Sequence, residues 1–192
     1  MKCVIIVHRW EGNPEADWYP WLKKELEDKG FEVLVPELPD PEAPDIETWV
    51  SALAEVVGTP DEETILVGHS LGGQTILRYL AGLNNQKVGG VVLVAPWFKL
   101  TPEATPDEEF KAIADPWLNT PLDFEKAKQA AGKIVAIFSD NDPYVPLDQK
   151  DFFSQKLGAE TLVVPRQGHF TQDDGVTEFK VVLDKILEVS HE

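Results

Sequence analysis

The stretch that decides the fold is residues 64–83, TILVGHSLGGQTILRYLAGL. An apolar, β-branched run at residues 65–67 leads into Gly68-His69-Ser70-Leu71-Gly72, and apolar residues at helical spacing follow. A strand, a Gly-x-Ser-x-Gly turn and a helix form the setting in which such a turn lifts a nucleophilic serine clear of a sheet. The stretch therefore predicts a nucleophile at Ser70, with an ordinary polar turn serine as the alternative.

The rest of the chain alternates short apolar runs with amphipathic stretches. Further strands are expected at residues 3–7, 31–35, 88–94, 133–138 and 160–164. Helices are expected from Asp17 to Gly30, from Asp45 to Gly58 and at residues 108–114, 124–131, 147–157 and 176–189. This alternation predicts an α/β fold with a doubly wound, mostly parallel six-stranded sheet flanked by helices, in the order 2-1-3-4-5-6. We expect residues 1–192 to form a single domain, with a short cap-like segment at about residues 97–122.

Charge and composition narrow the classes of partner. A formal net charge of −17 argues against nucleic acid and anionic membranes, and mildly favours neutral or cationic ligands. The single cysteine, Cys3, lies in an apolar run and forms no internal disulfide. The apolar run near the N-terminus is too short for a signal peptide or a membrane span, so a cytoplasmic location is expected.

Reactive side chains follow the predicted strands at the edge where doubly wound sheets bind ligands. They occur at residues 8–10, 68–72, 139–142 and 166–169. A serine nucleophile needs a base, and the base needs an orienting carboxylate. His169 fits the base and Asp142 the acid, although Asp140 follows the same strand and competes. The order Ser, Asp, His is the one that this kind of sheet imposes.

With these motifs the chain resembles the smallest α/β-hydrolases and is similar to the retinoblastoma-binding protein nine family of serine hydrolases. The resemblance rests on GHSLGG, on Asp-Pro-Tyr-Val-Pro at residues 142–146, on Gly-His-Phe at residues 168–170 and on the segment 18–21. It implies catalysis by Ser70, His169 and Asp142 without a metal or an organic cofactor. The family motif also favours Asp142 over Asp140.

The resemblance further implies an oxyanion hole made by the backbone N–H groups of Leu71 and Trp10. Arg9 stands where relatives often have glycine, which leaves the second donor open. Arg9 itself either touches an acidic group of the substrate or lies solvated on a surface loop.

Tryptophans and the remaining histidines have competing interpretations. Trp10, Trp97 and Trp117 fall in loops near strand ends, where they either line an apolar substrate pocket or pack. Two other tryptophans, Trp21 and Trp49, lie on helical core stripes. His8 and His69 are expected to be structural, and His191 to be solvated in the tail.

The leading prediction is a carboxylesterase-like serine hydrolase that cleaves small carboxylic esters, thioesters or activated amides through a Ser70 acyl-enzyme. The cap-like segment is too short for a substantial lid, which favours a shallow site. The alternative is a catalytically weak protein-interaction or ligand-binding module on the same fold. Nucleotide binding fits poorly, because no G-x-G-x-x-G follows the first strand and the sequence contains no G-x-x-x-x-G-K-[ST]. The four scattered histidines argue against a catalytic metal.

Overall fold

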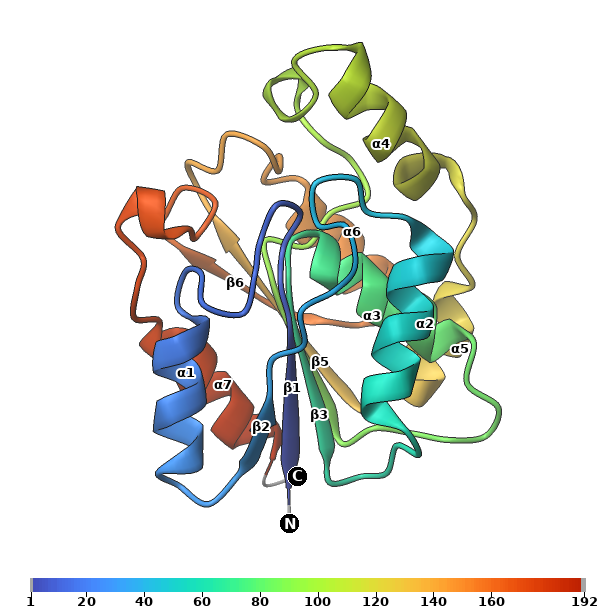
Figure 1. Ribbon diagram of the computed structural model, residues 1–192, viewed down its shortest axis with the longest axis vertical. Coiled ribbons are helices and arrows are strands. Elements are labelled where there is room, and N and C mark those ends of the chain that lie inside the picture. Colours follow the sequence, from blue (N-terminus) through green and yellow to red (C-terminus); the bar gives the residue numbers. More distant parts are fainter. Residues whose placement is uncertain (1, 191–192) are drawn as a thin grey trace.

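The computed structural model describes residues 2–190, so His191 lies outside the described residues. Its strands are β1 (Cys3–Val7), β2 (Glu32–Leu34), β3 (Thr64–His69), β4 (Gly90–Val94), β5 (Lys133–Ser139) and β6 (Glu160–Val164). All pair in parallel to form a six-stranded sheet in the order β2-β1-β3-β4-β5-β6 (Figure 1). This order confirms the predicted fold class.

The helices are α1 (Tyr19–Glu27), α2 (Ile46–Val57), α3 (Leu71–Ala81), α4 (Glu108–Asn119), α5 (Phe124–Ala130), α6 (Gln149–Leu157) and α7 (Lys180–Val189). Two short 3-10 turns, η1 (Pro102–Ala104) and η2 (Gln172–Asp174), interrupt the loops. Helices α1 and α7 cover one face of the sheet, while α2, α3, α5 and α6 cover the other (Figure 1). Helix α4 lies beyond the carboxyl ends of the strands.

Helices on both faces explain why the central strands are almost entirely apolar. Every residue of β3 and β4 is buried, and the buried apolar side chains form one cluster that spans both faces. No described helix is long and apolar enough to cross a membrane.

Asp17 does not cap α1, contrary to the expectation from sequence. The residue before the helix is Trp18, which makes no capping side-chain hydrogen bond. The Asp17 carboxylate instead lies 2.8 Å from Arg9 Nε, and its side chain is fully buried. Asp17 is therefore engaged in an ion pair with the loop after β1 instead of capping the helix.

Two helix boundaries also differ from expectation. Helix α4 continues past Ala114 and contains Pro116, which normally ends a helix because it lacks an N–H donor. The buried indole of Trp117 holds this last turn against the core. Helix α7 begins at Lys180 rather than near residue 176, because Phe179 has a non-helical φ of −134° and ψ of 78°.

Candidate active site

Ser70 lies at the turn between β3 and α3 with φ of 52° and ψ of −116°, a region that residues with a side chain rarely adopt. Two close approaches hold this turn in place. A Cβ on Gly68 would lie 2.7 Å from the backbone of Gly73, and one on Gly72 would lie 2.2 Å from the carbonyl oxygen of Val7. The glycines therefore let α3 start directly against β1, as the motif predicts.

His169 and Asp142 lie next to each other at the same edge of the sheet. His169 Nδ1 is 2.8 Å from Asp142 Oδ2, and the other carboxylate oxygen accepts the N–H groups of Tyr144 and Val145. A carboxylate only accepts hydrogen bonds, so Nδ1 carries the proton and Nε2 is left as a free base. This is the tautomer that general-base chemistry at Ser70 requires.

Asp140, the competing carboxylate, lies in a different position. Its Oδ1 accepts the backbone N–H of Arg166 at 2.7 Å, so it joins the loop after β5 to the loop after β6. Asn141 reinforces the same junction through Oδ1, which accepts from Ser139 Oγ and from the N–H of Gly168. Asp140 and Asn141 thus hold the two loops together, while Asp142 faces the imidazole.

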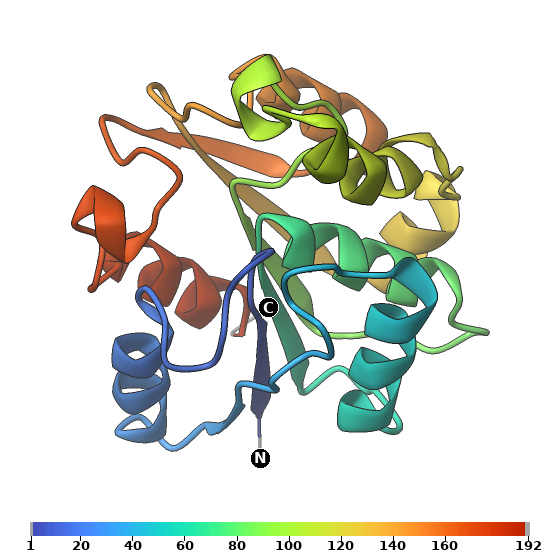
Figure 2. The same cartoon turned by 45° about the horizontal axis from the view of Figure 1, so that its top comes forward.

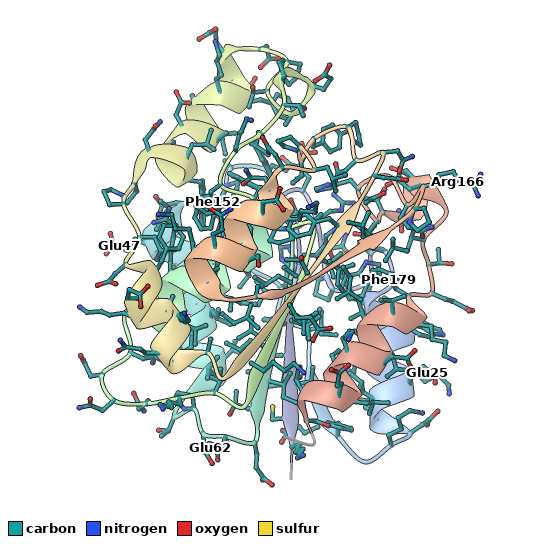
Figure 3. The ribbon with its side chains drawn as sticks, turned by 180° about the vertical axis from the view of Figure 1, so that it is seen from behind. Glu25, Glu47, Glu62, Phe152, Arg166 and Phe179 are labelled. Atoms are coloured by element: carbon teal, nitrogen blue, oxygen red, sulfur yellow. The ribbon has the colours of Figure 1, made fainter. Side chains whose placement is uncertain are left out.

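The loop that carries His169 is fixed from several sides. Asp174 Oδ2 accepts the backbone N–H of His169 at 2.9 Å. The next residue, Phe170, stacks on Phe179, which Figure 3 labels just before α7, with ring centroids 5.0 Å apart. Trp18 Nε1 donates to the carbonyl oxygen of Phe170 at 3.1 Å. These contacts fix the position of the imidazole before any substrate arrives.

His69, inside the serine motif, connects the nucleophile strand to this loop. Its Nε2 donates to the carbonyl oxygen of His169 at 2.8 Å, and its Nδ1 accepts from the Tyr19 hydroxyl at 2.7 Å. The ring is completely buried, and burial lowers the pKa of His69 from its usual 6.5 to about 3. His69 is therefore neutral at physiological pH and holds the loop as a hydrogen-bond donor.

This buried histidine predicts a pH-dependent stability. Its folded pKa lies below its unfolded value, so between about pH 6.5 and pH 3 the unfolded chain binds more protons. The stabilising effect of a neutral His69 is complete above pH 6.5 and is lost as the pH falls, by up to about 1.4 kcal/mol per pH unit. Urea unfolding at pH 7 and pH 5 measures the loss.

His69→Gln is the matched variant, because its amide can make both hydrogen bonds without titrating. We expect its stability to fall less between pH 7 and pH 5 than that of the wild type. Some pH dependence remains, because burial also lowers the pKa of His8. An equal fall in both proteins would contradict the role of His69.

Arg9 is neither solvated nor free to reach a substrate with its whole guanidinium. Its Nε pairs with the buried Asp17, and its Nη1 donates to the carbonyl oxygen of Trp10 at 3.1 Å. Burial alone would raise the pKa of the Asp17 carboxyl, but the neighbouring His69 and Arg9, together with the N–H of Gln172, outweigh burial and the pKa lies below its ordinary value. Asp17 also accepts the N–H of Gln172 at 2.9 Å, so it joins the loop after β1 to the loop after His169.

The backbone donors expected for an oxyanion hole are unoccupied. Among residues 2–190, no acceptor is found for the N–H of Leu71 or the N–H of Trp10. The Arg9 side chain donates to the carbonyl oxygen of Trp10 and so helps to hold this loop. An arginine at position 9, where relatives often have glycine, is therefore compatible with an ordered loop.

A pocket of about 400 Å³ opens over Ser70 and His169. The cap-like segment forms one wall of the pocket, and the loop that carries η2 forms another. Both segments lie near the carboxyl ends of the strands, the end of the molecule that comes forward in Figure 2. Its lining comprises Arg9, Trp10, Glu11, Ser70, Trp97, Leu100, Glu103, Ala104, Pro106, Phe110, Pro143, Tyr144, His169, Thr171, Asp173 and Asp174. The surface is thus a mixture of aromatic and acidic groups.

The structure brings Arg9, Trp10 and Trp97 to this pocket but not Trp117, so the expectation for Trp117 is wrong. Trp117 is 1% exposed, its Nε1 donates to the carbonyl oxygen of Pro44, and its ring packs against Trp49. It faces the core because α4 extends through this position. His8 is also structural: its two ring nitrogens bond to the backbone of Arg9 and Leu38.

Asp17, Tyr19, His69 and Asp174 support the site, and sequence patterns did not predict this role for any of them. An aspartate before a helix and a histidine beside a motif serine have common local interpretations, and only the fold brings them together. No group of three or more His, Cys, Asp or Glu side chains within residues 2–190 is arranged to hold a metal ion.

The chain is similar to known proteins over almost its whole length, including the residues of the candidate site. A family model described as serine hydrolase matches residues 4–188. YdeN of Bacillus subtilis (strain 168) is 33% identical over 184 residues, which cover 95% of this chain and 93% of YdeN. The serine hydrolase RBBP9 of Rattus norvegicus is 28% identical over 171 residues, which cover 88% of this chain and 87% of RBBP9. The crystal structure of the ydeN gene product matches with a TM-score of 0.91 and 30% identity, covering 100% of both chains.

Proposed function

The chain belongs to the serine hydrolase family, and from that premise we propose that it cleaves small carboxylic esters, thioesters or activated amides through an acyl-enzyme on Ser70. The observation that carries the proposal is the 2.8 Å contact between His169 Nδ1 and Asp142, with both His169 and Ser70 lining one pocket. The proposed roles are nucleophile for Ser70, base for His169 and orienting acid for Asp142.

The reaction begins when Ser70 Oγ attacks the carbonyl carbon and its proton passes to His169 Nε2. Asp142 stabilises the imidazolium that forms. The N–H groups of Leu71 and Trp10 bind the oxyanion of the tetrahedral intermediate. His169 then protonates the leaving group, and a water activated by the same imidazole releases the acid.

The substrate class follows from the size and lining of the pocket. A volume of about 400 Å³ lies at the small end of ligand pockets, and its aromatic lining suits an apolar acyl or alkyl group. We therefore propose short acyl chains as substrates. Arg9, which stands where relatives often have glycine and is the one feature in favour of a catalytically weak module, is accounted for by its ion pair with Asp17.

Fluorophosphonate labelling tests the nucleophile. We expect the probe to label the wild type covalently and not to label Ser70→Ala, because the probe reacts with an activated serine oxygen. A matched panel of chromogenic esters should show faster turnover of short than of long acyl chains by the wild type. Labelling that survives in Ser70→Ala would overturn the assignment, and equal turnover of all chain lengths would overturn the substrate class.

A further inference from the structure

Trp97 makes a contact that neither the fold nor the proposed mechanism requires. Its indole Nε1 donates a hydrogen bond to Ser70 Oγ at 3.2 Å, and the ring is only 2% exposed. Among the described residues, Ser70 Oγ makes no other side-chain hydrogen bond, so the oxygen expected to attack the substrate is held by an indole.

Packing does not explain this choice of acceptor. A buried indole N–H has to find a partner, and four other tryptophans find theirs in backbone carbonyl oxygens. The acceptors are the carbonyl oxygens of Glu42, Phe170, Pro39 and Pro44. Trp97 differs from them because it donates to the side chain of the proposed nucleophile.

The pairing register of β3 and β4 places Trp97 close to Ser70. His69, the last residue of β3, pairs with Val94, the last residue of β4, so the chain after Val94 runs beside Ser70. The segment then turns sharply at Ala95, with φ of 46°. The residue after Trp97 is fixed as well, because the buried Gln149 accepts the N–H of Phe98 at 2.8 Å.

The indole bond and the proposed proton transfer are chemically compatible. A serine hydroxyl has one donor hydrogen and two acceptor lone pairs. If a lone pair accepts from Trp97, the O–H remains free to donate to His169 Nε2, the nitrogen that Asp142 leaves unprotonated. Trp97 keeps its own proton throughout.

The strength of the bond changes along the reaction. In the resting protein it joins two neutral groups, and in the acyl-enzyme Oγ is an ester oxygen and a poor acceptor. Negative charge builds on Oγ only while its proton leaves for His169 and, in deacylation, while the bond from Oγ to the acyl carbon breaks. A donor to a charged oxygen is about twice as strong as a donor to a neutral one, so it lowers the barrier rather than only binding the ground state.

We propose that Trp97 is a catalytic residue whose indole N–H stabilises the charge that develops on Ser70 Oγ. This proposal rests on the proposed function. This role goes beyond lining the pocket, because it depends on one hydrogen atom of the ring rather than on its apolar surface.

The test removes that hydrogen and retains the ring. Replacement of Trp97 by 3-benzothienylalanine exchanges the N–H for sulfur with little change of shape. Trp97→Phe removes the donor by ordinary mutagenesis, but it also makes the ring smaller. We expect kcat and the rate of fluorophosphonate labelling to fall about 10- to 100-fold with KM little changed. The matched control is 3-benzothienylalanine at Trp117, whose N–H bonds to the Pro44 carbonyl in the core and should change kcat less than about threefold.

A second measurement reports the contact without activity. The indole Nε1–H resonance of Trp97, assigned by its loss in Trp97→Phe, should shift in Ser70→Ala because its acceptor is gone, while that of Trp117 should not. A resonance that stays in place overturns the inference. So does unchanged or faster labelling of the benzothienyl protein, which would mean that the indole is inert or restrains Oγ. A wild type that is not labelled overturns the proposed function and the inference together.

Discussion

Asp142→Asn is expected to lower kcat for a short-chain ester about 10⁴-fold without unfolding the protein. The carboxylate accepts the Nδ1–H of His169 at 2.8 Å and so leaves Nε2 free for the proton of Ser70. An amide at this position can donate to Nδ1, which moves the imidazole proton to Nε2 and blocks the base. Initial rates at saturating substrate, with unfolding curves for both proteins, measure the effect.

Asp140→Asn is the matched control, because it makes the same chemical change two residues away in the same loop. Within residues 2–190 the Asp140 side chain accepts only a backbone N–H, from Arg166, and an amide oxygen can replace that acceptor. We expect kcat to fall less than about tenfold. If Asp140→Asn were the more damaging change, the acid would have been assigned to the wrong residue.

Gly72→Ala is expected to destabilise the fold by about 3 kcal/mol or more, or to prevent folding. The added methyl group would lie 2.2 Å from the carbonyl oxygen of Val7 and 2.7 Å from that of His8. Both contacts are with the backbone of strand β1 and the residue after it, so α3 has to move away from the sheet. Denaturant unfolding followed by circular dichroism gives the change in the free energy of unfolding.

The adjacent Gly73→Ala provides the comparison. A methyl group there meets its nearest neighbours, the side chains of Leu93 and Pro96, at 3.5 Å, which is an ordinary contact distance. Alanine also favours the helix more than glycine does, so stability should stay within about 1 kcal/mol of the wild type or rise. Similar losses in both variants would mean that helix propensity, and not the approach to β1, decides the effect.

The strand order was predictable because both faces of this sheet are covered. Buried parallel strands appear as continuous apolar runs, and short crossovers then limit the order of the strands. Placing Ser70, Asp142 and His169 at one edge needed only that order, since each follows a different strand. Their catalytic roles stay a prediction until labelling and kinetics are measured.

The misplaced features share a physical cause. Trp117 and Asp17 have local contexts that suit a loop and a helix cap, but Trp117 bonds to Pro44 and Asp17 to Gln172, both far away in the sequence. The contact of Trp97 with Ser70 depends in the same way on the register of β3 and β4. Patterns along the chain carry no information on such pairs until the fold is known.

The ion pair of Arg9 and Asp17 constrains how this family can diversify. An uncharged residue in place of Arg9 alone would leave a fully buried carboxylate without its cation, which is among the most destabilising single changes a protein undergoes. We therefore expect a glycine at position 9 to occur together with a neutral residue at position 17. An alignment of diverging homologues should show substitutions at both positions or at neither.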